Sequence, residues 1–297
     1  MRISRRAFLR YCSTAAATLG LSRSELAALA AALRNPAGPN VVWLEGLACS
    51  GCSVSFLNHF SSTAPHDVAD VLIDVINLRY HTTVMAAAGQ TAAEAAYQTL
   101  QSGNFILVVE GGVPTAFGGR ACLVWHDQGR DVTLLEAVQT FGAVAAQVVC
   151  VGQCSGSGGI CVAPPNPTGV QPVATLLGRP TINVAGCPPH PQWVVWVLAQ
   201  LVAGNSVPVD VYGRPTQLFG TRVHSRCPLR NSEDATTWAD ESLCKEPLGC
   251  RGREAYGNCP DLKFNGGVNW CIGAGAQCLG CTAPTFPGPG PLYRWND

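Results

Sequence analysis

The sequence has no excess of charge of either sign and few charged residues overall. Of its 297 residues, 19 are Lys or Arg and 19 are Asp or Glu, so the formal net charge is zero and the charged fraction is 13%. The basic residues are scattered, which excludes the basic footprint of a nucleic-acid-binding protein. Because 47% of the residues are hydrophobic, the chain has ample material for a core, and disorder is not expected.

The chain also lacks an uninterrupted apolar run of the roughly 18 to 20 residues needed to span a bilayer. The nearest candidate, residues 14–32, is interrupted by Ser22-Arg23-Ser24-Glu25, and the chain ends in a Pro- and Gly-rich stretch with a short polar tail. We therefore expect no transmembrane anchor on this chain.

Adjacent Arg5 and Arg6 precede this alanine-rich stretch, a pattern that resembles a twin-arginine export signal. Residues 1–37 are expected to form the signal region, with cleavage somewhere between 28 and 37. An ordinary amphipathic N-terminal helix is the alternative. A twin-arginine signal exports folded proteins, so we expect a location in the periplasm or at the outer face of the cytoplasmic membrane. Thiolates would then be occupied by metal before oxidants reach them.

Regular secondary structure is expected only in the first part of the chain. Short apolar runs alternate there with helical patterns, which predicts strands at 41–44, 105–109, 148–151 and 181–184 and helices at 54–60, 133–141 and 192–202. This alternation is typical of an α/β domain, residues 38–211, with a parallel sheet covered on both faces. Residues 212–297 are rich in cysteine and turn residues, so we expect an irregular second domain that something other than secondary structure stabilises.

Cysteine is abundant, with 15 residues. Eleven of them, together with one histidine, sort along the chain into three groups of four. The first group is Cys49, Cys52, Cys154 and Cys187; the second group is His224, Cys227, Cys244 and Cys250; the third group is Cys259, Cys271, Cys278 and Cys281. Four soft ligands suit a cubane iron-sulfur cluster or a structural zinc, with a disulfide framework as the alternative. Three such centres indicate a path for electrons.

The first group is dispersed in sequence, but each ligand follows a predicted strand. Cys49 and Cys52 come after the strand at 41–44, Cys154 after 148–151 and Cys187 after 181–184. In an open parallel sheet, ligands bind beyond the carboxyl ends of the strands, so we expect these four side chains to meet. A thioredoxin-like redox pair is the alternative for Cys49 and Cys52.

The second and third groups are local in sequence. His224 lies three residues before Cys227, so both can reach one centre from a single turn. A neutral imidazole in place of a thiolate raises the potential of a cluster and suits a site near the surface. The alternative is a surface histidine beside a three-thiolate site. The third group has a single C-x-x-C pair, Cys278 and Cys281, whereas a zinc ribbon uses two, so zinc is disfavoured.

Ordered motifs along nearly the whole chain resemble the small subunit of nickel-iron hydrogenases. They are Trp43-Leu44-Glu45-Gly46 with Cys49-Ser50-Gly51-Cys52, Val151-Gly152-Gln153-Cys154, Pro165-Asn166-Pro167-Thr168-Gly169, Gly186-Cys187-Pro188-Pro189-His190-Pro191 and the cysteine-rich tail. The resemblance implies a flavodoxin-like first domain and three 4Fe-4S clusters. The first group would hold the proximal cluster, the group with His224 the distal one and the third group the medial one.

The resemblance also implies a heterodimer that catalyses reversible H2 oxidation. The nickel-iron site would lie on a hydrogenase large subunit that covers the proximal face, and no catalytic residue is expected on this chain. Electrons would leave near His224 to a cytochrome-type acceptor.

Two departures from commoner members of that family matter. Many relatives have proline where this chain has Cys271, so a four-iron medial cluster is expected, as in the nickel-iron-selenium branch. Oxygen-tolerant relatives add cysteines where this chain has Gly51 and Gly159. A six-cysteine proximal cluster is therefore not expected, although Cys161 lies only two residues beyond the second of these positions.

Two other classes of protein stay open at this point. A subunit of the related quinone-oxidoreductase or coenzyme-reducing complexes would share the first domain but lack the His224 and Cys259 sets. An exported zinc or disulfide protein is the other. Of the remaining cysteines, Cys12 belongs to the signal region and Cys150 is expected in the core. Cys122 and Cys161 are expected to be inert or joined in a disulfide, and Trp270, Phe264 and Phe286 to exclude water from the clusters.

Overall fold

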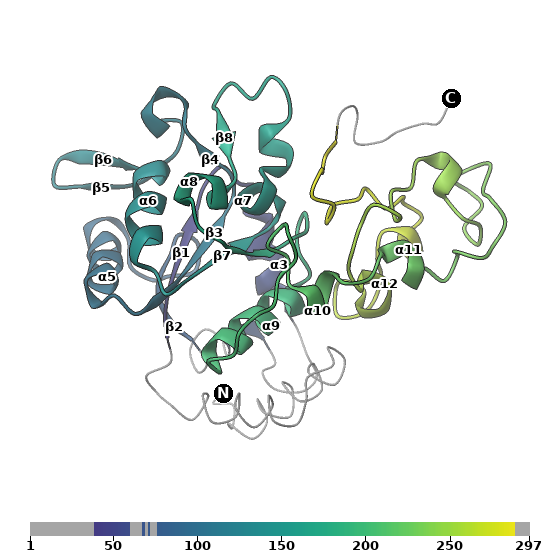
Figure 1. The fold of residues 1–297 in the computed structure, drawn as a ribbon, viewed down its shortest axis with the longest axis horizontal. Coiled ribbons are helices and arrows are strands. Elements are labelled where there is room, and N and C mark those ends of the chain that lie inside the picture. Colours follow the sequence, from purple (N-terminus) through teal and green to yellow (C-terminus); the bar gives the residue numbers. More distant parts are fainter. Residues whose placement is uncertain (1–38, 60–66, 69–70, 72–75, 289–297) are drawn as a thin grey trace.

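A five-stranded parallel sheet forms the first part of the molecule (Figure 1). The computed structural model describes residues 39–59, 67–68, 71 and 76–288, so the predicted signal region lies outside the described residues. The strands are β1 (Asn40–Glu45), β2 (Asn77–His81), β3 (Phe105–Glu110), β7 (Gln147–Val151) and β9 (Ile182–Val184), in the order β2-β1-β3-β7-β9. All four pairings are parallel. This is the flavodoxin-like order, with its switch point between β1 and β3, and the predicted α/β fold is confirmed.

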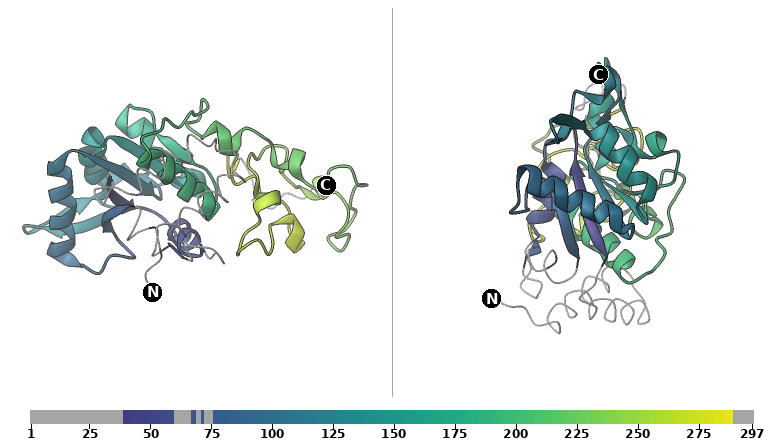
Figure 2. Two further views of the ribbon diagram at one scale, coloured as in Figure 1. Left: turned by 90° about the horizontal axis from the view of Figure 1, so that it is seen from below. Right: turned by 90° about the vertical axis from the view of Figure 1, so that its left-hand side faces the viewer.

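Alternating side chains on the strands build a core on each face of the sheet. Val42 and Leu44 of β1 pack in one cluster with buried residues of α5 (Gly89–Ser102) and α6 (Leu134–Val144). Val41 and Trp43 belong to the opposite cluster, with residues of α3 (Gly51–Leu57) and α9 (Pro191–Val202). Figures 1 and 2 show the sheet between these two helix layers. Strands β1, β3 and β7 contribute to both clusters, whereas the edge strand β9 contributes only to the second.

Some elements differ from the prediction. Helix α3 begins at Gly51, three residues before the predicted start, directly after Ser50 in a left-handed conformation with φ 56°. The sequence did not predict β2, a short edge strand with polar residues, or α5. Helix α5 buries the small residues Ala92, Ala93 and Ala96, so its apolar stripe is weak although alanine favours helix. The hairpin of β5 (Leu123–Asp127) and β6 (Arg130–Thr133) was not predicted either.

Short elements gather beyond the carboxyl ends of the strands. Strand β4 (Val113–Pro114) pairs with β8 (Val170–Gln171), and η1 (Ala116–Gly119) follows β4. Helix α7 (Gln153–Ser157) and η2 (Gly159–Val162) come directly after β7, and α8 (Val173–Leu177) follows β8. This edge of the sheet carries the cysteines of the first group.

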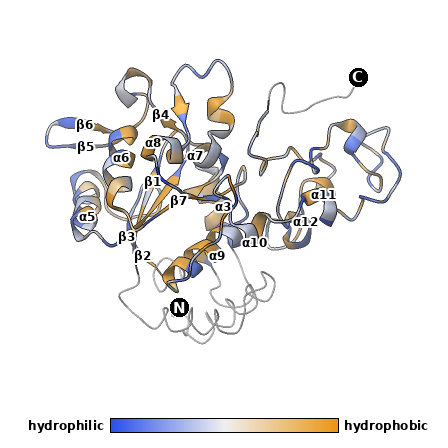
Figure 3. Ribbon diagram, viewed as in Figure 1, coloured by the Kyte–Doolittle hydropathy of each residue, from blue (hydrophilic) through white to orange (hydrophobic). Residues whose placement is uncertain are grey.

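Beyond residue 215 the described chain contains only helical segments of three or four residues. They are α10 (Thr216–Phe219), α11 (Val223–Arg226), η3 (Glu246–Leu248), α12 (Cys259–Leu262) and η4 (Ile272–Ala274). Figure 3 shows apolar residues concentrated in the sheet and α9, and far less densely in this second part. Its small core cluster combines Val223, Ala255, Trp270 and Ile272 with Cys227 and Cys278. Among the described residues, no helix is long and apolar enough to cross a membrane.

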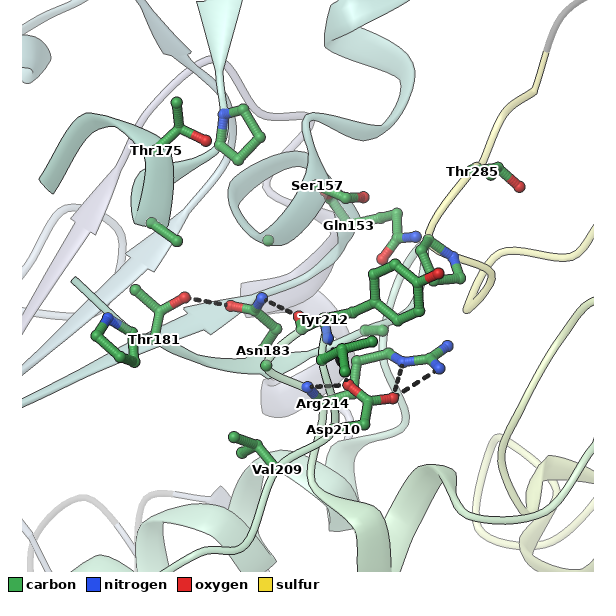
Figure 4. A pocket seen from close by; sticks show the side chains of 18 residues that line it. Gln153, Ser157, Thr175, Thr181, Asn183, Val209, Asp210, Tyr212, Arg214 and Thr285 are labelled. Atoms are coloured by element: carbon green, nitrogen blue, oxygen red, sulfur yellow. Dashed lines mark hydrogen bonds and ion pairs between the residues drawn. The ribbon is translucent and has the colours of Figure 1, made fainter. Parts of the chain in front are cut away.

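The two parts of the molecule meet at a cleft of about 670 Å³ beside the edge strand β9 (Figure 4). On its wall, the buried Arg214 pairs with Asp210, its Nε lying 2.9 Å from Oδ2. Its Nη1 donates to the Thr282 carbonyl oxygen at 2.9 Å. The guanidinium also lies 4.9 Å from the ring centroid of Tyr256. One arginine thus ties the segment after α9 to the C-terminal residues.

Candidate metal centres

The four cysteines of the first group come together beyond the carboxyl ends of β1, β7 and β9. Cys49 precedes α3 and Cys52 lies in its first turn, Cys154 lies in α7, and Cys187 follows β9. Burial raises the pKa of the Cys52 thiol, and the nearby charges of Glu110, Cys187 and Cys49 raise it further. The pKa of Cys154 is raised mainly by its hydrogen bond with Cys161 and by burial, and the charges of Cys187 and Cys52 raise it further. The expected convergence of strand-end ligands is therefore present in the structure.

The carboxylate of Glu110 lies directly behind Cys52. Glu110 ends β3, is fully buried, and accepts hydrogen bonds from Cys52 N at 3.0 Å, Ser53 N at 3.1 Å, Trp43 Nε1 at 3.2 Å and the Ser53 hydroxyl. Burial raises its pKa, whereas the hydrogen bonds from Ser53 lower it. The sequence did not predict a role for this residue, although its place at a strand end was a usable signal. Glu110 holds the first turn of α3, and hence Cys52, against the sheet.

Replacing Glu110 with Ala is expected to destabilise the first domain strongly. The change leaves buried donors of Trp43, Cys52 and Ser53 without an acceptor, which costs about 3 kcal/mol or more and lowers the thermal midpoint by roughly 6–12 °C. Thermal unfolding of the assembled protein measures the shift. Glu94→Ala on the exposed face of α5 is the matched control. Equal midpoints for the two variants would contradict this role for Glu110.

Cys161 is a fifth thiol beside the first group. Its Sγ lies 3.3 Å from the Leu47 carbonyl oxygen, and it makes a hydrogen bond with Cys154 that lowers the pKa of Cys161 to about 7. Cys161 also packs closely against Gly112, since a Cβ added to this glycine would lie 3.1 Å from the Cβ of Cys161. All described cysteines are free thiols, so the alternative of a Cys122 to Cys161 disulfide is not observed. Its contact with Cys154 distinguishes Cys161 from the buried core thiol of Cys150.

The second group assembles around α11. The charges of Cys227 and Cys244 contribute to raising the pKa of Cys250, for which burial is the largest cause. His224 adjoins these thiols through the backbone: its N–H donates to the Gly252 carbonyl oxygen at 2.9 Å, and Cys227 N donates to the His224 carbonyl oxygen at 3.1 Å. The three thiols thus lie close together, and ligation by the imidazole stays a prediction.

The third group assembles between α12 and the loop after η4. Burial raises the pKa of Cys259, and the charges of Cys281 and Cys271 raise it further. Burial also raises the pKa of Cys278, and the charge of Cys281 is the next largest cause. Trp193 of α9 positions the start of α12, because its Nε1 donates to Asn258 Oδ1 at 2.7 Å. Helix α9 therefore helps to place the third group.

The third group lies between the other two, although it comes last in the sequence. On one side, Cys281 is near Cys187 of the first group: a hydrogen bond with the Cys187 backbone lowers the pKa of Cys281, while burial, the largest effect, raises it to about 12. On the other side, the charge of Cys250 of the second group contributes to raising the pKa of Cys278. The three groups form a continuous series in space.

The donor set fits iron-sulfur clusters. Burial favours neutral thiols at these positions, and coordinated metal supplies the positive charge that buried thiolates need. In the described part of the chain, no three Cys, His, Asp or Glu side chains are grouped as ligands of a single metal ion. A cubane takes one thiolate on each of four irons, so its ligands need not converge on one point. Trp270 shares a buried cluster with Cys227 and Cys278, in keeping with its expected role in excluding water.

Two family models match successive parts of the chain. The model described as the 20 kDa subunit of NADH ubiquinone oxidoreductase matches residues 49–201. The model described as the C-terminal part of the NiFe/NiFeSe hydrogenase small subunit matches residues 219–293. The second match covers the second group and the third group.

Relatives match over nearly the full length. The periplasmic [NiFeSe] hydrogenase small subunit of Desulfomicrobium baculatum is 37% identical, with 99% of each chain covered. The periplasmic [NiFe] hydrogenase small subunit of Solidesulfovibrio fructosivorans is 36% identical over 96% of this chain and 90% of the relative. Among solved structures, the [NiFeSe] hydrogenase of Desulfovibrio vulgaris Hildenborough superposes with a TM-score of 0.80 at 36% identity, covering 86% of this chain and 98% of the matched chain.

Proposed function

The chain belongs to the small subunits of nickel-iron and nickel-iron-selenium hydrogenases, which transfer electrons for an active site on a large subunit, and from this premise we propose that it holds three 4Fe-4S clusters. The first group would bind the proximal cluster, the third group the medial cluster and the second group the distal cluster. When bound, these clusters would accept and donate single electrons between the large subunit and an external acceptor.

The position of the third group between the other two supports this proposal most directly. Cys281 adjoins Cys187 on one side and Cys278 adjoins Cys250 on the other. Because electron transfer requires closely spaced centres, such a series provides a path from the carboxyl edge of the sheet to α11. The cysteines of this chain would bind the clusters and Trp270 would exclude water from them.

The large subunit is proposed to cover the carboxyl edge of the sheet around Cys49. Cys49 itself is exposed, and apolar side chains nearby in sequence are exposed too: Val54 follows Cys52 on α3, and Ile160 precedes Cys161. Apolar side chains left in solvent beside partly buried thiols are typical of a surface that a partner covers. The large subunit would thereby seal the first group from water.

Export to the periplasm by the twin-arginine route is part of the proposal. The relatives from Desulfomicrobium baculatum and Solidesulfovibrio fructosivorans are named as periplasmic proteins, and Arg5 and Arg6 supply the adjacent arginines of the signal. Replacing both with lysine, then separating periplasm from cytoplasm, tests this route.

Metal analysis of the purified heterodimer tests the cluster proposal. We expect about twelve irons bound by this chain and no zinc, in addition to the metals of the large subunit. Two or fewer irons on this chain would contradict it. The rival in which the chain serves a quinone-oxidoreductase complex is disfavoured because residues 219–293 match the hydrogenase C-terminal family.

Three exposed arginines surround the proposed electron exit at His224. Arg226 pairs with Asp261 at 2.6 Å, Arg230 donates to the Ser225 carbonyl oxygen at 2.9 Å, and Arg222 donates to the Tyr256 hydroxyl at 3.3 Å. Only one of the three guanidinium groups has a carboxylate among these partners. These arginines favour an acidic docking surface on a cytochrome-type acceptor that binds at α11.

H2 oxidation is therefore expected to depend on salt in opposite directions for acceptors of opposite charge. With anthraquinone disulfonate, an anion, the rate should fall severalfold as salt is raised, because the Debye length shrinks to about 10 Å at 0.1 M. With benzyl viologen, a cation, the rate should rise. The double variant Arg222→Gln with Arg230→Gln should flatten both dependences, and Arg130→Gln in the distant hairpin should not. Identical salt profiles for the wild-type protein, the double variant and Arg130→Gln would contradict an exit at α11.

A further inference from the structure

A buried guanidinium lies at the junction of the second group and the third group. Arg251 directly follows Cys250, and only 5% of its side chain is exposed. Its Nε donates to Glu254 Oε2 at 2.9 Å, and its Nη1 donates to the Pro287 carbonyl oxygen at 2.7 Å. The charged end of this side chain is thus fixed inside the protein by hydrogen bonds.

The same residue is in direct contact with the loop that carries two ligands of the third group. Its backbone N–H donates to the Cys278 carbonyl oxygen at 2.7 Å. A Cβ on Gly280, between Cys278 and Cys281, would lie 3.2 Å from Arg251 Nε and 3.3 Å from its Cζ. Gly280 has φ +74°, so glycine both makes the turn and lets the guanidinium approach the backbone.

The charge of Arg251 is only partly compensated. A guanidinium stays protonated at any physiological pH. The side chain of its partner Glu254 is 47% exposed, so water screens the carboxylate far more than the buried guanidinium. The net effect on the interior is a fixed positive charge beside Cys250 and the Cys278–Cys281 loop.

We propose that Arg251 raises the reduction potentials of both the distal and the medial cluster, an inference that rests on the proposed function. Adding an electron makes a cluster more negative, and a nearby fixed cation in a low dielectric stabilises that reduced state. Arg251 acts through electrostatics on the ligand loops and takes no part in catalysis. Raising both potentials together would leave the driving force between these two clusters unchanged and would favour electron transfer from the proximal cluster to the medial one.

The competing interpretation is that Arg251 only anchors the C-terminal segment to Glu254 through its contact with Pro287. Redox titration of the heterodimer, followed by EPR, separates the two interpretations. Arg251→Met removes the charge and should shift the reduction equilibria of both clusters at least tenfold toward the oxidised form, which corresponds to about 59 mV for one electron. Arg251→Lys keeps the charge and should restore most of the potential. The proximal cluster should not move in either variant.

Two further variants keep the inference testable if Arg251→Met loses iron. Glu254→Gln removes the partly exposed countercharge without removing the guanidinium, so it should raise both potentials. Arg253→Met removes an exposed guanidinium, 60% accessible and paired with Glu246, and is expected to change them little. Unchanged potentials in Glu254→Gln, or equal shifts for Arg251→Met and Arg251→Lys, would overturn the inference. If the wild-type protein holds fewer than three clusters, the proposed function itself fails instead.

Discussion

Replacing Cys271 with proline is expected to convert the medial four-iron cluster into a three-iron cluster. Cys271, a proposed ligand of the third group, is an exposed cysteine at the start of η4. Its φ of −48° is close to the value that proline requires, so the variant should fold. Removing one thiolate takes away both a ligand and a negative charge, which raises the potential of the remaining cluster.

EPR of the oxidised heterodimer provides the measurement. The variant should show an intense three-iron signal that the wild-type protein lacks, and its iron content should fall from about twelve to about eleven. Cys122→Ser is the control, because Cys122 is a half-buried thiol outside all three groups. This variant should change neither the EPR signal nor the iron content. A three-iron signal in the wild-type protein would show that Cys271 is not a ligand.

Replacing His224 with Ala is expected to slow electron exit without stopping chemistry on the large subunit. The imidazole is the proposed surface ligand of the distal cluster. Mutating even the outer-shell partners of metal ligands typically costs about 10- to 100-fold in affinity or activity, and we expect a loss of this size here. H2 oxidation with an external acceptor should fall by that amount. H/D exchange, which needs no electron to leave the heterodimer, should stay within a factor of about two.

The control for this variant is His126→Ala, an exposed histidine in the β5–β6 hairpin that pairs with Asp131. It should affect neither assay. Loss of both H2 oxidation and H/D exchange in His224→Ala would show that His224 is needed for folding, and iron content measured on the same sample would reveal that outcome.

Local patterns in the sequence predicted four of the five strands of the sheet because these four are largely continuous buried runs. Residues 105–110 are buried at every position, and such a run between turn residues is typical of a central parallel strand. Helix α9 was predicted within one residue, since Pro191 begins it. In contrast, α5 was missed because its buried face consists largely of alanine, and β2 because an edge strand needs less apolar surface.

The candidate ligands of the first group could be predicted because a parallel sheet brings all its carboxyl ends to one edge. Neither Glu110 behind Cys52 nor Cys161 beside Cys154 was predicted as a neighbour. Glu110 is 58 residues from Cys52, and no local periodicity relates them. Their contacts depend on how β3 lies against β1 and how the chain turns after α7.

The sequence by itself determined the fold class, the family and the twelve candidate ligands, because strand patterning, motif order and ligand spacing are local properties. Only the tertiary structure brought Cys281 beside Cys187 and Cys278 beside Cys250, so that the third group lies between the first and the second. It also buried Arg251 between two of these groups. Both follow from packing between segments distant in sequence, which local sequence patterns do not encode.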